Sequence, residues 1–368
     1  MSSLKNHSKK IVFICPYPFN IAPGQRFRYE QYLALLTGAG YHIQIKPFLD
    51  ERTFKLLYKP GHFLIKIFGI LKGFIGRFIH LSAASKADFV FIFREASPIG
   101  PPVFEFILSK IFKKKIVYDF DDAIWLPNTS EENKTVSILK WHSKIKAICR
   151  WSHVVSCGNT FLCDYARKYN TNVVLNPTTI DTVTLHNPDL YAPLKARQKM
   201  ITIGWTGTHS TLKYLDGILP VIEALEKKLP GQFRFVIIAD KRPAFSFPSF
   251  DFVAWNKATE IQDLLYFDVG LMPLSDDVWS RGKCGLKALQ YMALGIPAVV
   301  SSVGVNSSIV DHGVNGYLCR NDEDWETSLT KLITNPDHGH QLGRAAREKI
   351  LRYFSVESNK GNFLSLFG

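Results

Sequence analysis

The sequence predicts an α/β protein built from two parallel-sheet halves. Short apolar runs of strand length alternate with helical patterns, and this alternation favours parallel sheets. The alternation begins at Ile11 and restarts at Met200, after a polar stretch that contains prolines. A chain of 368 residues is long enough for two domains of ordinary size, and its 46% hydrophobic residues can supply a core to each.

Two series of apolar segments carry this prediction. In the first half we expect strands at Ile11–Cys15, His42–Lys46, Phe89–Phe93, Lys115–Tyr118, His153–Ser156 and Asn172–Leu175. In the second half we expect strands at Met200–Trp205, Phe233–Ala239, Phe250–Ala254, Val269–Leu274 and Ala298–Ser301. Helical patterns such as Arg28–Leu36 and Val103–Phe112 lie between strands, as crossovers between parallel strands require.

The charge balance narrows the class of partner. The formal net charge is +13 and the pI is about 9.3, which favours nucleotides, nucleic acid or an acidic membrane surface. No basic stripe interleaved with base-stacking aromatics is present, so we expect no nucleic-acid partner. The six cysteines show no zinc or C-x-x-C spacing, which predicts free thiols in a reducing compartment. Lys9 and Lys10 precede only a short apolar run, so we expect no cleavable signal and a cytoplasmic protein.

The most informative segment is Gly282–Val300. It predicts a glycine-containing loop, a helix over Leu286–Leu294, a stop at Gly295 and then a buried strand. Arg281, Lys283 and Gly285 lie in the loop before the helix. Backbone N–H groups, a helix N-terminus and cations together suit a phosphate. An ordinary turn with two solvated cations explains the same residues equally well.

This segment resembles the signature of the glycosyltransferases of family 4, the group 1 enzymes with the GT-B fold. Gly285 matches the second glycine of that signature, and Gln290, Met292, Ala293, Gly295 and Pro297 follow in register. Gly282 and Gln290 stand where the family carries its two glutamates. Gln290 can still donate and accept hydrogen bonds to sugar or ribose hydroxyls.

The resemblance implies a GT-B fold of two Rossmann-like, doubly wound parallel-sheet domains facing across a cleft. It divides the chain into an acceptor-side domain (1–184), a linker (185–199), a nucleotide-sugar domain (200–354) and a C-terminal segment (355–368) that packs back on the first domain. It also implies transfer of a sugar from a nucleotide-diphosphate sugar, with retention of configuration. We expect no metal and no other cofactor.

The resemblance places further donor contacts at two turns. Gly24 and Arg26 follow the first strand, where the family's loop approaches the donor phosphates; neighbouring Arg28 is expected to be solvated. Gly207 and Thr208 follow the first strand of the second half, although helix capping explains them too. Trp255 falls where the family holds the base, although a buried core tryptophan is the more frequent explanation. In the signature loop, Arg281, Gly285, Leu286 and Gln290 are expected to bind the donor, and Lys283 to stabilise the leaving diphosphate.

An acidic cluster follows the fourth strand. Asp119, Asp121 and Asp122 lie at a carboxyl end, where such folds place their sites, and adjacent carboxylates raise one another's pKa. Asp121 or Asp122 is expected to orient or deprotonate the acceptor hydroxyl. Capping of a following helix is the alternative. Arg94 and Glu95 also end a strand, where an ion pair between structural residues is equally plausible.

The segment from Arg52 to Ala87 is rich in basic residues and contains no carboxylate. Within it, residues 63–81 are strongly apolar, and Lys66 and Arg77 fall on one side of a helix. This pattern favours a basic amphipathic helix on an anionic membrane surface over a core helix with a narrow wet edge.

The sequence therefore predicts a cytoplasmic glycosyltransferase, peripheral on the inner face of the membrane. Its partners would be a nucleotide-diphosphate sugar and a glycan or lipid-linked acceptor, in cell-surface polysaccharide or glycolipid synthesis. Two alternatives stay open. One is a sugar-nucleotide epimerase on the same fold. The other is a non-catalytic glycan- or membrane-binding scaffold, which the missing glutamates at Gly282 and Gln290 keep possible.

Overall fold

The computed structural model describes residues 8–57, 59, 61–127, 140–191 and 200–368. The chain divides into two compact units, the first formed by Met1–Thr178 with Lys360–Gly368 and the second by Thr179–Asn359. The N-terminal part of the first unit thus ends at Thr178, whereas the boundary expected from the sequence was residue 184. Of the expected linker, residues 185–191 belong to the second unit, and residues 192–199 lie outside the described part of the chain.

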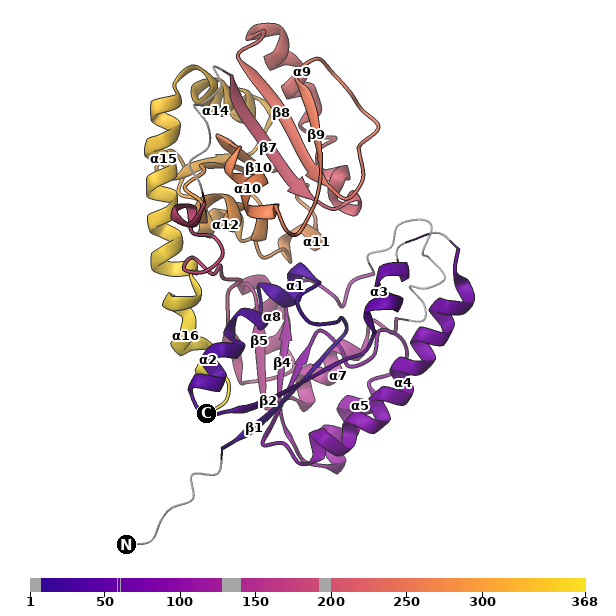
Figure 1. Cartoon of the computed structure of the whole chain (residues 1–368). Coiled ribbons are helices and arrows are strands. Elements are labelled where there is room, and N and C mark those ends of the chain that lie inside the picture. The colour runs from indigo at the N-terminus through magenta and orange to yellow at the C-terminus, as the bar shows by residue number, and fades with distance from the viewer. Residues whose placement is uncertain (1–7, 58, 60, 128–139, 192–199) are drawn as a thin grey trace, which may run out of the picture. The chain divides into compact units, whose positions relative to one another are not determined.

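The first unit is built on a six-stranded parallel sheet in the order β2-β1-β3-β4-β5-β6 (Figure 1). Its strands are β1 (Lys10–Cys15), β2 (His42–Pro47), β3 (Phe89–Phe93), β4 (Lys115–Phe120), β5 (Val154–Cys157) and β6 (Val173–Leu175). Its helical elements are α1 (Pro23–Arg26), a 3₁₀ turn (Glu30–Tyr32), α2 (Leu33–Gly38), α3 (Glu51–Leu57), α4 (Phe63–Ser85), α5 (Val103–Phe106) with a π-helical turn (Ile107–Ile111), α7 (Lys144–Trp151) and α8 (Thr160–Arg167). The strand order reverses between β1 and β3, so loops after these strands leave the sheet side by side.

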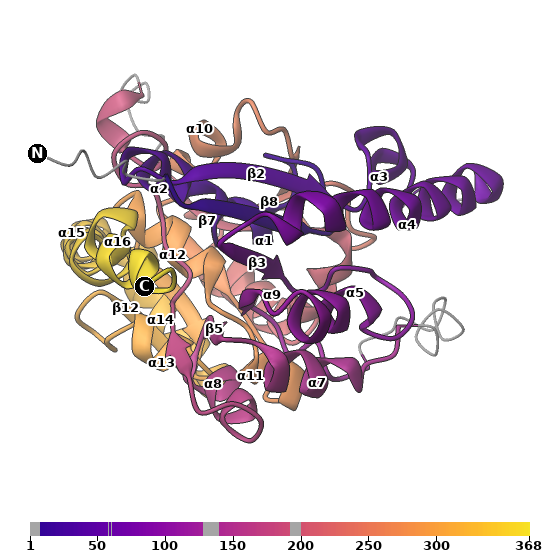
Figure 2. The same ribbon diagram turned by 90° about the horizontal axis from the view of Figure 1, so that it is seen from below.

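Two glycines let α4 pack closely on the rest of the first unit. A Cβ at Gly69 would come within 2.3 Å of the Thr53 side chain, and one at Gly73 within 2.6 Å of the Phe48 ring. Since real Cβ atoms do not approach so closely, only glycine fits at these positions. The helix therefore lies against α3 and the segment after β2, and α3 and α4 run side by side in both views (Figures 1 and 2).

The outer face of α4 is apolar and exposed. Its large side chains Phe63, Leu64, Phe68, Leu71, Ile75, Phe78 and Ile79 are between 54% and 77% exposed. Arg77, expected on the wet side of this helix, is instead only 1% exposed and donates to the carbonyl oxygens of Cys15, Lys46 and Ala96. The sequence analysis was wrong about this residue because periodicity shows which side chains share a face, not which face is covered. The alternative of an ordinary core helix is also wrong, since the apolar side faces outwards.

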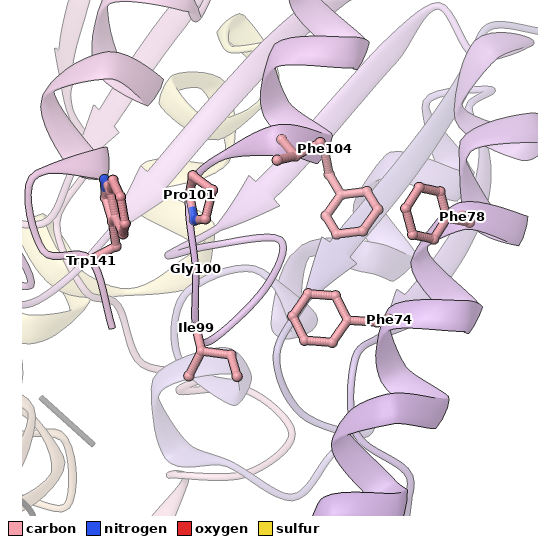
Figure 3. Close-up of a pocket in the computed structure, with 8 residues that line it drawn as sticks. Phe74, Phe78, Ile99, Gly100, Pro101, Phe104 and Trp141 are labelled. Atoms are coloured by element: carbon pink, nitrogen blue, oxygen red, sulfur yellow. The ribbon is translucent and has the colours of Figure 1, made fainter. Parts of the chain in front are cut away.

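A cavity of about 470 Å³ lies between α4, the loop after β3 and Trp141. Phe74 and Phe78 line it from α4, and Phe104 contacts both rings (Figure 3). The lining residues within the described part of the chain are all apolar or glycine.

The C-terminal residues complete the core of the first unit. Helix α16 (Val356–Ser365) begins in the second unit, and its last turns belong to the first. Phe363 stacks on Tyr32 with ring centroids 4.1 Å apart, and Phe367 packs against Phe91 and Phe13. These buried rings fix the end of the chain to the sheet of the first unit.

The second unit holds a six-stranded parallel sheet in the order β12-β11-β10-β7-β8-β9. Its strands are β7 (Ile201–Gly207), β8 (Phe233–Ala239), β9 (Phe250–Ala254), β10 (Val269–Met272), β11 (Ala298–Ser301) and β12 (Gly316–Cys319). Its helical elements are two 3₁₀ turns (Pro188–Leu190 and His209–Tyr214), α9 (Leu219–Lys228), α10 (Glu260–Leu265), α11 (Val278–Arg281), α12 (Leu286–Ala293), α13 (Asn306–Ile309), α14 (Asp322–Thr334), α15 (Pro336–Lys349) and a π-helical turn (Ile350–Phe354) before α16. This is the dinucleotide-binding strand order, which reverses between β7 and β10.

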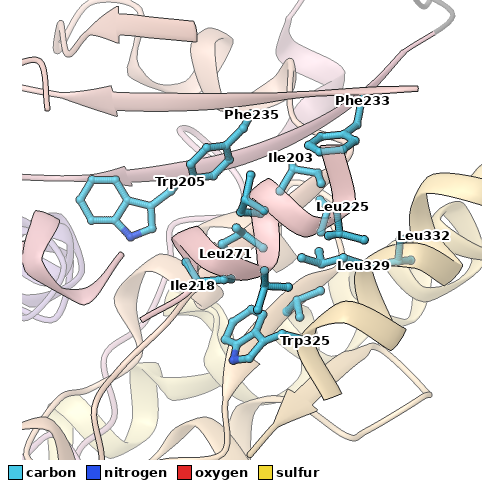
Figure 4. Packing of buried hydrophobic residues seen from close by; sticks show 14 of the residues in the cluster. Ile203, Trp205, Ile218, Leu225, Phe233, Phe235, Leu271, Trp325, Leu329 and Leu332 are labelled. Carbon is cyan, nitrogen blue, oxygen red and sulfur yellow. The ribbon is translucent and has the colours of Figure 1, made fainter. Parts of the chain in front are cut away.

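One buried cluster holds the second unit together. Strands β7 and β8 contribute Trp205, Ile203 and Phe235, and α14 covers them with Trp325 and Leu329 (Figure 4). Each of these side chains is at most 6% exposed. The sheet is therefore rigidly backed, and its carboxyl edge can carry functional loops.

Candidate functional site

The candidate site of the second unit lies where its strand order reverses. Strand β7 pairs directly with β10, so the turn after β7 and the loop after β10 leave the same edge of the sheet. The hydroxyl of Tyr291, on α12, accepts a hydrogen bond of 2.9 Å from the backbone N–H of Thr206 near the end of β7. The structure thus brings Gly207 and Thr208 to the same edge as the loop that leads into α12.

Gly285 shapes the loop before α12. Its φ of +73° lies in the left-handed region, and a Cβ there would come within 2.1 Å of Ile309. Both constraints demand glycine. Helix α12 starts at the next residue, Leu286. Its N-cap position is Gly285, which has no side chain that could cap the helix. The first backbone N–H groups of α12 have no partners within the helix, which is the usual basis of an anion site.

The two cations of this loop differ in their surroundings. Lys283 is half-buried, and its ammonium lies 5.2 Å from the centroid of the Trp279 ring. Arg281 is exposed and donates to both oxygens of Asp276, at 2.8 and 3.2 Å. The hydrogen bond from Arg281 lowers the pKa of Asp276, so this arginine already carries a carboxylate partner. Lys283 also lies nearer than Arg281 in the chain to the start of α12 at Leu286.

The other residues predicted to bind the sugar donor differ in their contacts and in their exposure. Thr208 caps the 3₁₀ turn His209–Tyr214 in a reciprocal capping box with Thr211, as the capping alternative expected. Gln290 is 8% exposed and its amide lies 3.3 Å from the Nε2 atom of His186. Trp255 is 38% exposed directly after β9, so the buried-core explanation is wrong for it.

A polar pair that was not predicted from the sequence also lies at this edge. The Nδ1 atom of His209 lies 2.6 Å from Asp240, which also accepts from the His209 backbone N–H. Partial burial is the largest single effect on the pKa of Asp240 and raises it, but the hydrogen bonds and the charge of His209 contribute to a combined lowering that outweighs burial, so the pKa lies below its ordinary value. Asp240 directly follows β8, so the rule that singled out Asp121 would also have found it.

In the first unit, one arginine gathers the acidic cluster. Arg94 donates from Nε to Asp121 at 2.8 Å and from Nη2 to Asp122 at 2.7 Å. A Cβ on Gly24 would lie 3.2 Å from an Asp121 oxygen and 3.5 Å from Arg94, so the turn after β1 contacts the same cluster. Residues 121–127 form bends and turns, and Arg94 forms ion pairs with both carboxylates.

Burial raises the pKa of Asp121 above its ordinary value, and the charge of Arg94 opposes this rise. The neighbouring Asp122 adds a smaller upward effect. The mutual effect of neighbouring carboxylates expected from the sequence is thus present, but burial is the larger cause of the raised pKa. A carboxyl group with a raised pKa is better suited to proton transfer near neutral pH.

Two further residues of this region differ from expectation. Arg28, expected in solvent, is 2% exposed and forms a two-point ion pair with buried Asp119. Arg28 is buried because it pairs with Asp119, which lies on β4 and is far away in sequence. Asp119 is therefore a structural residue. Glu95 pairs with Lys144 at 2.7 Å instead of with Arg94.

Arg26, expected at the donor phosphates, is 8% exposed, and its guanidinium lies 5.3 Å from the centroid of the Phe27 ring.

Within the described residues, no three His, Cys, Asp or Glu side chains are grouped so as to hold a metal ion. The six cysteines are all buried free thiols. No described helix is both long and apolar enough to span a membrane.

Residues 200–335 match the family model described as "Glycosyl transferases group 1". The second unit thus resembles the group 1 glycosyltransferases. A curated relative, N-acetyl-alpha-D-glucosaminyl L-malate synthase of Bacillus anthracis, is 24% identical over 114 residues. That match spans 30% of this chain and only 29% of the relative's length.

Solved structures extend the fold comparison to nearly the whole chain. Sucrose-phosphate synthase from Thermosynechococcus elongatus is 15% identical, with a TM-score of 0.65 and 98% of each chain covered. HepE of Anabaena, solved with UDP and glucose, is 16% identical, with a TM-score of 0.62 over 97% of this chain and 99% of its own. The predicted GT-B fold and the resemblance to glycosyltransferases are confirmed.

Proposed function

We propose that this protein transfers a sugar from a nucleotide-diphosphate sugar to a hydroxyl of a glycan or lipid-linked acceptor, with retention and without a metal. One observation carries the proposal. The turn Gly207–Thr208 follows β7 and the loop Arg281–Leu286 lies between β10 and α12, so both are at the strand reversal of the unit that matches the glycosyltransferase model. Open α/β sheets bind nucleotides at this position. The UDP held by the structurally similar HepE supports a nucleotide-diphosphate donor.

On the donor side, the leaving diphosphate gains negative charge as the bond to the sugar breaks. The N-terminus of α12 offers backbone N–H groups at Leu286, and Lys283 offers an ammonium beside the same loop. Donors that are already oriented stabilise developing charge without reorganising. Arg281 would stabilise the leaving diphosphate less, because it forms an ion pair with Asp276.

On the acceptor side, the cluster of Arg94, Asp121 and Asp122 supplies the base. Arg94 fixes the two carboxylates, and burial raises the pKa of Asp121 towards the range useful for accepting a proton from a hydroxyl. Gly24 leaves room above Asp121, since a larger residue would crowd the carboxylate at 3.2 Å. The acceptor hydroxyl would thus be oriented or deprotonated by Asp121 or Asp122.

The exposed apolar face of α4 is the proposed contact with an anionic membrane surface, which would make the enzyme peripheral on the inner face. Phe68, Leu71 and Ile75 follow the spacing of one helix face and are 54–77% exposed. Lys72, 73% exposed at the same helix, adds positive charge beside this face, although Asp50 pairs with it at 2.8 Å. Membrane binding would therefore depend more on apolar burial than the sequence pattern suggested.

The donor proposal is tested by thermal-shift measurements with UDP, GDP, ADP, CMP and dTDP, with and without magnesium. At a concentration of about 100 times Kd, binding to the native state stabilises by about 2.7 kcal/mol. We expect one nucleoside diphosphate to raise the melting temperature without magnesium. Absence of a shift with every nucleotide would reject the transferase. Conversion of a donor without any acceptor would indicate the epimerase instead.

The membrane proposal is tested by sedimentation with anionic vesicles. Phe68→Ser should weaken binding, because this side chain is 77% exposed on α4. Val314→Ser is the matched control, since Val314 is 60% exposed on the second unit. Equal sedimentation of the two variants and the native protein would contradict the proposal.

A further inference from the structure

The cavity beside α4 is distinct from the site residues discussed so far. Its volume of about 470 Å³ falls in the range of small-molecule pockets. Figure 3 shows Phe74, Phe78 and Phe104 together on one side and Trp141 on the other. Among the described residues of this lining, the Trp141 indole N–H is the only side-chain hydrogen-bonding group. Such a surface recognises hydrocarbon and offers almost nothing to a polar ligand.

The cavity continues into the exposed apolar face of α4. Phe78 lines the cavity and is 59% exposed, and Val103 and Trp141, also in the lining, are 44% and 52% exposed. A hydrocarbon chain could therefore pass from that face into the cavity along apolar side chains alone.

Buried charges hold the wall of the cavity in place. Arg77 donates to the carbonyl oxygen of Ala96, and the ammonium of Lys144 donates to that of Ser97 at 2.7 Å. Glu105 accepts from the Ala96 N–H at 2.9 Å. Trp141 adopts a left-handed φ of 54°, a conformation that bulky residues avoid and that clusters at ligand clamps. These contacts fix the loop that forms the wall, so the cavity is a built feature of the unit.

The same loop connects the cavity to the acidic cluster. Ile99 lines the cavity, and Arg94, which binds Asp121 and Asp122, lies five residues earlier. Five residues span at most about 18 Å. Ile99 in the cavity wall therefore lies no more than about 18 Å from the residue that binds the proposed acceptor base.

We propose that this cavity holds the hydrocarbon chain of a lipid-linked acceptor and so selects acceptors that carry a long apolar chain. The inference rests on the proposed transferase function and names its acceptor class. The occupant is a membrane amphiphile, because the lining is apolar, it continues into the exposed face of α4, and the segment Arg52–Ala87 is basic without a carboxylate.

Photolabelling with a diazirine-bearing hexadecyl phosphate, below its micellar concentration and without vesicles, tests this inference. Labels on the native protein should map to residues 74–78 and 99–104. Val103→Asp should reduce labelling by about tenfold or more, because a carboxylate in an apolar cavity opposes hydrocarbon. Val103→Trp should reduce it too, by filling the space without a charge.

Val314→Asp is the matched control, because Val314 is 60% exposed on the second unit and does not line the cavity. It should keep native labelling, and melting temperatures will show that each variant is folded. Labels that map elsewhere, or equal labelling of Val103→Asp, would overturn the inference. A preserved nucleotide shift in that case would leave the transferase proposal standing, whereas loss of the shift in the native protein would reject the transferase itself.

Discussion

Replacing Arg94 with methionine removes the cation that Asp121 and Asp122 share. Breaking a fully buried ion pair costs about 3–5 kcal/mol, and an exposed pair contributes about 0.2–1 kcal/mol. The three side chains are 12–25% exposed, so solvent screening reduces the expected loss to about 2–3 kcal/mol. For a unit of this size, that loss lowers the melting temperature by about 4–12 °C.

The loss should depend on pH. Burial already raises the pKa of Asp121, and Arg94 opposes the rise, so the pKa rises further in Arg94→Met. Over the pH range between the ordinary aspartate value and this raised pKa, the folded variant binds a proton that the unfolded chain has lost. Its stability therefore falls as the pH rises through that range. The melting temperature of Arg94→Met should therefore fall further below that of the native protein at pH 8 than at pH 5.

Calorimetric melting at both pH values measures this effect. Arg281→Met is the control, because Arg281 and Asp276 form an exposed pair whose loss should change the melting temperature very little. Adding Asp121→Asn to Arg94→Met should recover part of the loss. A melting temperature of Arg94→Met equal to that of the native protein at pH 8, or a difference that is the same at pH 5 and pH 8, would refute this prediction.

Three other predictions follow from the same structure. Lys283→Ala should fold normally and lose turnover by about a hundredfold to a thousandfold, with Lys283→Arg recovering only part, and near-native steady-state rates would refute its role. Asparagine at Asp121 or Asp122, whichever is the base, should lower turnover much more than donor affinity, and full turnover in both variants would leave the cluster a structural role. Gly73→Ala should destabilise by about 1–3 kcal/mol, since its Cβ would meet a phenylalanine ring at 2.6 Å. Gly76→Ala, with no atom closer than 3.6 Å, should instead stabilise by up to about 1 kcal/mol in chemical denaturation, and the reverse order would contradict the packing of α4.

The strands were predictable because buried parallel strands are continuous apolar runs. Phe89–Phe93, Phe233–Ala239 and Ala298–Ser301 match the structure at both ends. Strand β12 was missed because Gly316–Cys319 is short and begins with glycine. The helix expected over Val103–Phe112 divides into α5 and a π-helical turn, a change of hydrogen bonding that apolar spacing does not report.

The site was predictable only in part, because contacts between distant segments decide it. Gly285 could be found, since a signature glycine marks a turn, and the structure gives it a left-handed φ. The partner of Arg28 is 91 residues away, and no local pattern reveals that pairing. The burial of Arg77 depends on three carbonyl oxygens from separate segments. Local sequence thus identifies turns and strand ends, and tertiary structure decides which charges remain exposed.

The central claim is that the strand reversal of the second unit binds a diphosphate. Calorimetric titration should compare the nucleoside diphosphate that gives the largest thermal shift with its own nucleoside, on the native protein and on Lys283→Ala. The diphosphate should bind the native protein far more tightly than the nucleoside. Lys283→Ala should lose about tenfold to a hundredfold in affinity for the diphosphate, the equivalent of one charged hydrogen bond of about 1.5–3 kcal/mol. Equal affinities for nucleoside and diphosphate, or an unchanged affinity in Lys283→Ala, would contradict the assignment.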